Sequence, residues 1–426
     1  MISKYKRKQF SQDTSYTVVI DKKFKTNSWK IKFIASLDEI DSPALSLAAS
    51  VLSSCNSEEK TMPMLNSKLN DLYGADLFSS VSKRGDMFIM TVGISLIDDA
   101  YALENEKLSE EAVKLLVKTI YSPYITDGGF DKEIFEIEKR DLTDSILAKI
   151  NDKRRYLFTK SMAEIFKGEP AAKSLYGTVE NAEKLTPQVV YKAYCDFLNK
   201  SIKEIYFEGT SNYPESENIL KKAFSENSSD KQTEKLCFDS EPNFKEKTSF
   251  VKEELNVSQS KFLIALKNKS YDKYTMRMLS AILGGIPSSK LFSNVREKQS
   301  LCYYCTSSYN SAKSTLLIDC GVDLGKEQAA IDAVMQQIEE IKKGNITDEE
   351  MNAAILAFDN SLKSVGDVQG SYTSWYFECF CSGEFIQPDV SSERYHNITK
   401  EMVKNAASDL VEDTVYIICQ NEKEML

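Results

Sequence analysis

One sequence pattern occurs twice in this chain, as ITDGGFDKEIFEIEKRDLTDSI at residues 125–146 and as ITDEEMNAAILAFDNSLKSV at residues 346–365. Each copy opens with Ile-Thr-Asp and continues with a pattern typical of a long helix. A second helix is predicted just before each copy, because apolar residues recur there at the spacing of one buried helical face. These residues are Val113, Leu116, Val117 and Ile120 in the first case, and Ile331, Val334, Met335, Ile338 and Ile341 in the second.

The elements around the two copies also match in order. Upstream of each copy, apolar residues alternate as they do in a half-buried strand of an antiparallel sheet. They are Phe88, Met90, Val92 and Ile94, and then Leu316, Ile318, Cys320 and Val322. Downstream of each copy, a helical pattern leads to a strand, at residues 185–209 and again at residues 398–420. We therefore predict an α+β protein with two homologous domains, each an antiparallel-rich sheet covered by helices on one face.

The two copies are separated by a polar stretch, SENSSDKQTEKLCFDSEPNFKEK at residues 225–247. This composition, charged and poor in apolar residues, is typical of a surface linker. We predict an N-terminal domain at residues 1–223, a linker at residues 224–246 and a C-terminal domain at residues 247–426.

Composition limits the classes of partner that the protein can bind and the cellular compartment that we expect for it. The net charge of −10 and the sequence pI near 5.1 argue against nucleic acid, because phosphate binding requires a basic face. No apolar run approaches the ~20 residues of a membrane-spanning helix, and the early stretch KYKRKQFSQDTS holds no signal-peptide core. We expect a cytoplasmic protein whose nine cysteines are mostly reduced thiols.

A more specific pattern lies at residues 281–305, which read AILGGIPSSKLFSNVREKQSLCYYC. It combines a helix that ends in two glycines with Ser-Ser-Lys-Leu-Phe, Arg-Glu-Lys and Leu-Cys-Tyr. This pattern resembles the C-terminal-half signature of the insulinase/pitrilysin metallopeptidases, a family that includes the mitochondrial processing peptidase. The resemblance extends over nearly the whole chain, because the family unit is also a doubled α+β domain of about this length.

Active halves in that family carry an inverted zinc motif, His-x-x-Glu-His, on an early helix of the N-terminal domain. This chain has a single histidine, His396, in a predicted surface loop, so the two imidazoles are missing. The early helix is predicted at residues 42–52, with Ser42 as its cap. The resemblance places the degenerate zinc positions at Ser46, Ala49, Ser50 and Ser145.

None of these four side chains replaces what is missing. A catalytic zinc site needs about three firm protein ligands and an open position for water. The resemblance therefore implies that the chain is no peptidase on its own and holds no cofactor. Zinc is expected only in a partner subunit.

Arg296 and Tyr303 match the family's Arg/Tyr pair at the family's spacing of seven residues. The resemblance implies that such a pair faces the zinc of another half or subunit. There, arginine holds a substrate carbonyl and the phenol donates to the developing oxyanion. We expect a non-catalytic subunit of a heterodimeric zinc metallopeptidase, which binds an extended peptide substrate. Its expected partner is a homologous subunit with His-x-x-Glu-His, and a homodimer is left open.

Three other interpretations stay open. An Arg at a helix end and a Tyr in a strand are commonly an exposed ion pair and a core-edge residue. The chain could also be a scaffolding subunit with no role in proteolysis. A cysteine-based zinc or redox protein would use Cys302, Cys305, Cys379 and Cys381. Strand geometry argues against this last class, because residues three apart in a strand point to opposite faces and Cys302 and Cys305 would not meet.

Overall fold

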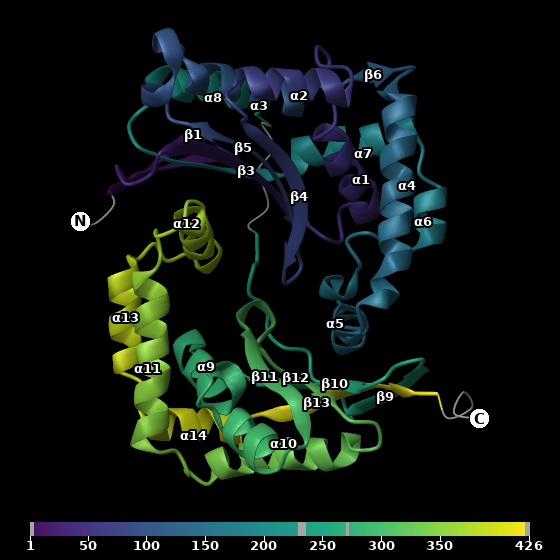
Figure 1. Ribbon diagram of the computed structural model, residues 1–426, viewed down its shortest axis with the longest axis vertical. Helices are drawn as coiled ribbons and strands as arrows, with labels where there is room; N and C mark the ends of the chain where they lie inside the picture. Colours follow the sequence, from purple (N-terminus) through teal and green to yellow (C-terminus); the bar gives the residue numbers. More distant parts are fainter. Residues whose placement is uncertain (1–3, 229–235, 270–271, 422–426) are drawn as a thin grey trace. The chain divides into compact units, whose positions relative to one another are not determined.

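The computed structural model describes residues 4–228, 236–269 and 272–421, and the chain forms two compact units (Figure 1). Unit 1 comprises Met1–Ala148, Lys173–Cys237 and Gly366–Glu378. Unit 2 comprises Lys149–Ala172, Phe238–Val365 and Cys379–Leu426. Each unit therefore includes one segment that comes from the other half of the chain.

Unit 1 is built on a six-stranded sheet with the strand order β1-β2-β8-β3-β5-β4. Strands β2 and β8 are parallel, and the other neighbours are antiparallel. The bounds are β1 (Lys4–Ser11), β2 (Thr14–Ile20), β3 (Thr26–Ser36), β4 (Asp76–Arg84), β5 (Met87–Ile97) and β8 (Ile202–Gly209), with a small separate pair, β6 (Ile125–Thr126) and β7 (Gly129–Phe130).

Unit 2 is built on a five-stranded sheet with the order β11-β12-β10-β13-β9. Its bounds are β9 (Ser249–Leu255), β10 (Ser260–Lys267), β11 (Cys302–Asn310), β12 (Thr315–Val322) and β13 (Val411–Gln420). Only the β9–β13 pair is parallel among these strands. From the parallel pair outward, this sheet has the same order and directions as β2-β8-β3-β5-β4 of unit 1. The predicted fold class, two α+β domains with one sheet plan, is confirmed.

Helices and an apolar core cover one face of the unit 1 sheet. The bounds are α1 (Ser42–Leu52), α2 (Met62–Asp71), η1 (Asp99–Tyr101), η2 (Leu103–Asn105), α3 (Leu108–Tyr121), α4 (Lys132–Ala148), α6 (Val179–Glu183), α7 (Pro187–Lys200) and α8 (Pro214–Glu226). The alternating residues predicted for β5 all enter this core. Helix α1 begins after Asp41, whose carboxylate accepts a hydrogen bond from the Ala44 N–H at 3.1 Å. The cap is therefore Asp41 and not Ser42, because Ser42 is already inside the first turn.

The unit 2 core forms in the same way, and the alternating residues predicted for β12 enter it. The helix bounds are η3 (Lys149–Asn151), α5 (Lys153–Ile165), η4 (Pro170–Ala172), α9 (Lys273–Ser280), η5 (Ala281–Gly285), η6 (Leu291–Lys298), η7 (Ser311–Lys313), α10 (Glu327–Lys342), α11 (Asp348–Lys363), α13 (Pro388–His396) and α14 (Lys400–Ser408), with α12 (Ser371–Ser382) at the boundary of the units. No helix in the described ranges is both long and apolar enough to cross a membrane.

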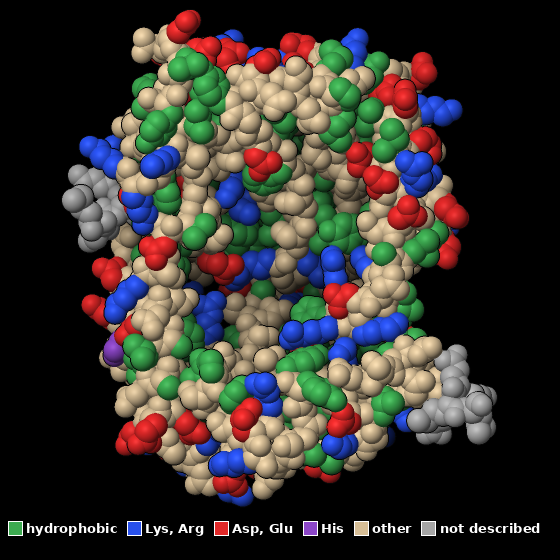
Figure 2. Space-filling model, in the orientation of Figure 1, with side chains coloured by type: hydrophobic (Ala, Val, Ile, Leu, Met, Phe, Trp, Pro, Cys, Tyr) green, Lys and Arg blue, Asp and Glu red, His purple; other side chains and the backbone are tan. Residues whose placement is uncertain are grey.

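Helix α5 comes from the N-terminal half of the chain but packs on the second face of the unit 2 sheet. Its apolar residues Leu157, Met162 and Ile165 join a separate core with Leu263 and Tyr416. Figure 2 shows Lys and Arg side chains gathered around α5, which begins Lys-Arg-Arg.

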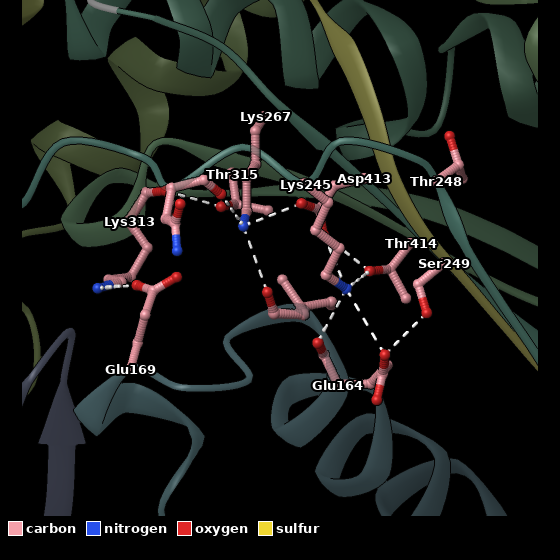
Figure 3. A network of polar contacts seen from close by, with 12 residues as sticks. Glu164, Glu169, Lys245, Thr248, Ser249, Lys267, Lys313, Thr315, Asp413 and Thr414 are labelled. Atoms are coloured by element: carbon pink, nitrogen blue, oxygen red, sulfur yellow. Dashed lines mark hydrogen bonds and ion pairs between the residues drawn. The ribbon is translucent and has the colours of Figure 1, made fainter.

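Three lysines of unit 2 hold the end of α5 and the loop after it (Figure 3). The Lys245 ammonium donates to the Glu164 carbonyl oxygen at 2.9 Å, and Lys267 donates to the Ile165 carbonyl oxygen at 3.2 Å. Lys313 forms an ion pair of 2.6 Å with Glu169. The last carbonyl oxygens of a helix carry partial negative charge, so cations placed there stabilise it.

The start of α12 is bound by a negatively charged side chain of unit 1, whereas the end of α5 is bound by positively charged lysines. The buried carboxylate of Glu208 in β8 accepts hydrogen bonds from the Gly370 N–H, at 2.6 Å, and from the Thr373 N–H. The first N–H groups of a helix lack partners within it and carry partial positive charge, which a carboxylate satisfies.

The predicted domains were contiguous in sequence. They therefore did not include the assignment of Lys149–Ala172 to unit 2 and of Gly366–Glu378 to unit 1. The predicted linker at residues 224–246 also begins too early, because α8 continues to Glu226 and Phe224 is fully buried. Part of that linker, residues 229–235, lies outside the described residues. From residue 236 to β9 the chain has no regular element, as predicted.

Candidate functional site

Helix α1 carries the positions at which the family resemblance places the zinc motif. The hydroxyl of buried Ser46 donates a hydrogen bond to the Leu175 carbonyl oxygen at 2.7 Å. The Ser50 hydroxyl lies 3.5 Å from the Ser46 carbonyl oxygen and donates to it. Ala49 is buried in the core of unit 1. Both hydroxyls therefore bind backbone carbonyl oxygens of unit 1.

Helix α4 is the element expected to supply the third ligand. Ser145 is exposed on α4. An acidic side chain of α4, Glu138, lies near the end of α1, where its Oε1 accepts a hydrogen bond from the hydroxyl of Ser54, two residues after α1, at 2.6 Å. Glu138 lies about two helical turns before Ser145, and Ser54 lies just beyond Ser50. Sequence reasoning missed Glu138, because only the packing of α4 on α1 distinguishes it from the other acidic residues of α4.

The residues at these positions do not fit zinc. Protein zinc sites use imidazole nitrogen, thiolate sulfur or carboxylate oxygen. The degenerate positions supply hydroxyls and a methyl group, and Glu138 is a single carboxylate. Within residues 4–228, 236–269 and 272–421, the one group of at least three clustered His, Cys, Asp or Glu side chains is Cys302, Cys305 and Cys320 in unit 2.

The second part of the candidate site is the segment at residues 281–305. Two short π-helical turns, η5 and η6, lead into strand β11. Turns of this kind are rare and are found frequently at functional sites. Leu291 and Val295 are fully buried and fix η6 to the core of unit 2.

Two contacts explain the residue types in this segment. Gly284 lies so close to β11 that a β-carbon on it would be 2.7 Å from the Ser307 backbone nitrogen. Lys290, only 8% exposed, forms an ion pair of 2.9 Å with Glu350. Glu350 also accepts a hydrogen bond from the Thr347 N–H at 3.0 Å, in the capping box that starts α11. The family-like segment and the second Ile-Thr-Asp stretch therefore meet at Glu350.

Replacing Gly284 by Ala is expected to lower the free energy of unfolding by about 1–3 kcal/mol, because the added methyl group overpacks the η5–β11 contact. Thermal or chemical unfolding of the purified protein measures this change. Gly285→Ala is the matched control, since its β-carbon would meet nothing closer than the Ser280 carbonyl oxygen at 3.2 Å. Equal effects of the two substitutions would contradict the account of Gly284.

Arg296 is presented by η6 with its side chain 41% exposed. Its guanidinium lies over the Phe292 ring, 4.7 Å from the ring centroid, and its Nε is 3.8 Å from the exposed Glu297 carboxylate. Exposed ion pairs of this kind contribute little free energy. The guanidinium is therefore available for a further partner, and its backbone is held by the buried neighbours on η6.

Tyr303 is the extra residue of a β-bulge. Cys302 pairs with Val322 and Tyr304 pairs with Gly321, so Tyr303 has no residue opposite it on β12. Bulges re-aim side chains and are common next to active sites. The Tyr303 side chain is 52% exposed.

The Tyr303 phenol donates a hydrogen bond to Asp323, which follows β12. This hydrogen bond and the charge of Asp323 raise the pKa of the Tyr303 phenol. Lys326, at 2.8 Å from Asp323, lowers the pKa of that carboxyl. Tyr303 therefore stays protonated, and able to donate, at neutral pH. Asp323 was not foreseen from the sequence, because it meets Tyr303 only through the pairing of β11 with β12.

The bulge also overturns the expectation about the cysteines. It adds one residue between Cys302 and Cys305, so their side chains lie on the same face of the sheet. The expectation that these two residues face opposite sides was wrong. Cys379 and Cys381 are buried in α12 and take no part in this group, so the four-cysteine arrangement considered above does not form.

A cavity of about 460 Å³ lies in unit 2 between α5 and the sheet. Its walls are both apolar and polar: Asp152, Arg154, Arg155, Phe158, Leu263, Thr306, Ser308, Leu317 and Asp319. Arg154 is already paired, with its Nε 2.5 Å from Asp319 and its guanidinium 4.4 Å from the centroid of the Tyr304 ring. The cavity therefore combines apolar contact area with hydroxyl groups and charges, as ligand pockets do.

His396 is the last residue of α13. We predicted that it lies in a loop, so that expectation was wrong. Its side chain is exposed, and its Nε2 lies 3.1 Å from the Asp359 carboxylate. The position at the surface of unit 2 is as expected. A single exposed imidazole with one carboxylate neighbour does not provide a catalytic zinc site.

Comparisons with known proteins show which sequences and structures this chain is similar to. A family model described as "Peptidase M16 inactive domain" matches residues 184–358. The chain is 25% identical over 407 residues to the "Probable inactive metalloprotease YmfF" of Bacillus subtilis (strain 168), covering 94% of each protein. A crystal structure of a conserved protein from Enterococcus faecalis V583 has a TM-score of 0.90 at 22% identity, covering 98% of this chain and 99% of that one. The peptidase M16 inactive domain from Pseudomonas fluorescens has a TM-score of 0.80 at 16% identity, covering 98% of each chain.

The fold and the degenerate zinc helix together define a metallopeptidase-like protein without a metallopeptidase's metal site. With the comparisons, the likeness is specific: residues 184–358 match the family model of the peptidase M16 inactive domain, and nearly the whole chain is similar to a protein described as a probable inactive metalloprotease. With a single histidine, the chain has no His-x-x-Glu-His motif, which agrees with its similarity to proteins described as inactive.

Proposed function

We propose that this chain is the non-catalytic subunit of a heterodimeric zinc metallopeptidase, in which it binds the peptide substrate and supplies Arg296 and Tyr303 to the partner's zinc site. The partner is a homologous subunit that carries His-x-x-Glu-His. The observation that carries the proposal is the exposure of both side chains on a segment whose backbone is fixed by buried neighbours. A side chain that only stabilises the fold does not need to be exposed on a fixed backbone.

The chemistry of the two side chains fits the role. A guanidinium offers several fixed N–H donors for a substrate carbonyl, and a protonated phenol donates one hydrogen bond to a developing oxyanion. To do so, the Tyr303 hydroxyl must exchange Asp323 for the substrate oxygen. Both donors increase the rate only where another subunit supplies the metal-bound water.

The peptide is expected to bind in an extended form along a sheet edge. Strands β4 and β11 are edge strands of their sheets, and each leaves backbone groups on one side without a neighbouring strand. The cavity beside α5 offers an amphipathic pocket for one substrate side chain. These features support a peptide ligand and do not define its sequence.

The test begins with affinity purification of the tagged chain from its own cells and mass spectrometry of the copurified proteins. A stoichiometric subunit with His-x-x-Glu-His is expected. Recovery of the chain alone or as a homodimer would contradict the proposal.

Within that complex, Tyr303→Phe and Arg296→Ala are each expected to reduce kcat/KM for peptide hydrolysis by about 10²–10³, because a transition-state donor is lost. Tyr309→Phe, on the same strand, is the control and is expected to leave the rate unchanged. Full activity of both site variants would instead favour a scaffolding subunit with no role in proteolysis.

A further inference from the structure

Three sulfur atoms meet inside unit 2, where the family role assigns them no function. Cys305 and Cys320 lie directly opposite each other on β11 and β12, with Cα atoms 4.3 Å apart, and form a disulfide. The Cys302 sulfur lies within 4.8 Å of both. The bulge at Tyr303 is what turns Cys302 toward the other two.

The three sulfurs differ in access. Cys305 is 4% exposed and Cys320 is fully buried, and both belong to the apolar core of unit 2. Cys302 is half-buried at the margin of the same core. A reagent in solution therefore reaches the disulfide through Cys302, because apolar side chains of the core enclose the other two sulfurs.

We propose that Cys302, Cys305 and Cys320 form a thiol–disulfide exchange site, in which Cys302 transfers reducing equivalents from a small-molecule thiol to the buried Cys305–Cys320 bond. The position of a free thiol beside a disulfide is the arrangement that exchange requires. The inference is independent of the peptidase role, since the exchange needs neither a partner subunit nor a peptide substrate.

The reaction balances in three steps. The Cys302 thiolate attacks one sulfur of the Cys305–Cys320 bond, which breaks as the new bond forms, and the released cysteine takes up the proton that Cys302 lost. A small-molecule thiolate then attacks the Cys302 sulfur, forms a mixed disulfide with it and releases the second buried cysteine, which is protonated. A second small-molecule thiolate attacks the mixed disulfide, the small-molecule disulfide leaves, and Cys302 becomes a thiol again. The protein gains two electrons and two protons in all.

The surroundings favour exchange over metal binding. Burial raises the pKa of the Cys302 thiol to about 11, although the charge of Arg296 partly opposes this effect. A metal ion would need thiolates at all three positions at once, and an apolar core disfavours each of these charges. Exchange needs one thiolate at a time and keeps the other sulfurs neutral.

The kinetics distinguish the relay from direct attack on the buried bond. The oxidised full-length protein is treated with increasing concentrations of glutathione, and the loss of the mapped Cys305–Cys320 bond is followed by alkylation and mass spectrometry. In the wild type the rate is expected to level off at high glutathione, because the internal attack by Cys302 comes first. In Cys302→Ser it is expected to be at least about tenfold lower and to rise linearly, because only direct attack remains.

Cys237→Ser, which removes an exposed cysteine outside the group, is the matched control and is expected to behave as the wild type. Cys302→Ala serves as a second variant, and circular dichroism establishes that each variant is folded. Glutathione attached at Cys302 is the expected trapped intermediate. Equal rates with and without Cys302, or an oxidised protein in which Cys305 and Cys320 are not bonded, would overturn the proposal.

Discussion

Replacing Asp13 by Asn is expected to lower the free energy of unfolding of unit 1 by about 3–5 kcal/mol, because it leaves a buried lysine without its counter-charge. The Lys203 ammonium lies 2.5 Å from the Asp13 carboxylate, with the two side chains 1% and 0% exposed. Asp13 lies between β1 and β2, and Lys203 is in β8, so the pair links the edge hairpin to the middle of the sheet. Chemical denaturation of the purified protein measures the change.

Two control variants test whether the loss of stability comes from leaving a buried charge without its partner. A double variant, Asp13→Asn with Lys203→Met, is expected to regain much of the lost stability, because residues of similar volume then replace the pair and no buried charge is left without a partner. Asp348→Asn removes an exposed pair with Lys400, 2.8 Å apart, and is expected to cost less than about 1 kcal/mol. A similar effect of Asp13→Asn and Asp348→Asn would contradict the argument.

The same pair predicts a dependence of stability on pH. Burial tends to raise the pKa of Asp13, but hydrogen bonds from Lys203, Ser11 and Thr14 outweigh it and lower the pKa to about 2. A carboxyl group with a lowered pKa in the folded state contributes stability above its unfolded pKa, which is 3.8. This contribution is expected to disappear as the pH falls from about 4 to about 2. Acid unfolding of Asp13→Asn should lack this component of the pH dependence.

The second large effect is expected at the start of α12. Glu208→Gln should lower the stability of the α12 attachment by about 2–3 kcal/mol, because a charged acceptor is lost and a side-chain amide cannot accept from both backbone N–H groups. Hydrogen exchange at Gly370 and Thr373 should become faster. Glu378→Gln is the control, since that carboxylate is 49% exposed and pairs with Arg84 at the surface of unit 1. Unchanged protection at residues 370–373 in Glu208→Gln would contradict this role.

Regular elements were predictable where a local pattern set them. The alternating residues of β5 and β12 all enter a core, and α3, α10 and α11 occur where apolar spacing and the helical pattern after the second Ile-Thr-Asp predicted them. These signals depend on neighbours a few residues apart, so a single sequence contains them. Helix α5 forms as well, but its apolar residues do not identify the sheet they cover, which belongs to residues far along the chain.

The candidate site was predictable in part for a related reason. Arg296 and Tyr303 were found through a motif within one short stretch, and both are exposed in the structure. Glu138, Asp323 and Cys320 were missed, because each acquires its partner through packing or strand pairing across many residues. A bulge changes the face of every residue after it, and no residue type at Tyr303 indicates one.

The sequence by itself determined the two-domain α+β class and the absence of the His-x-x-Glu-His motif, because periodicity and a count of histidines are properties of the chain alone. It also determined which short segment carries the Arg/Tyr pair. Only the tertiary structure decided which unit holds α5 and α12, and that Cys302 meets Cys305 and Cys320. These last features depend on helix docking and on strand register, which are set by the summed packing energy of distant residues.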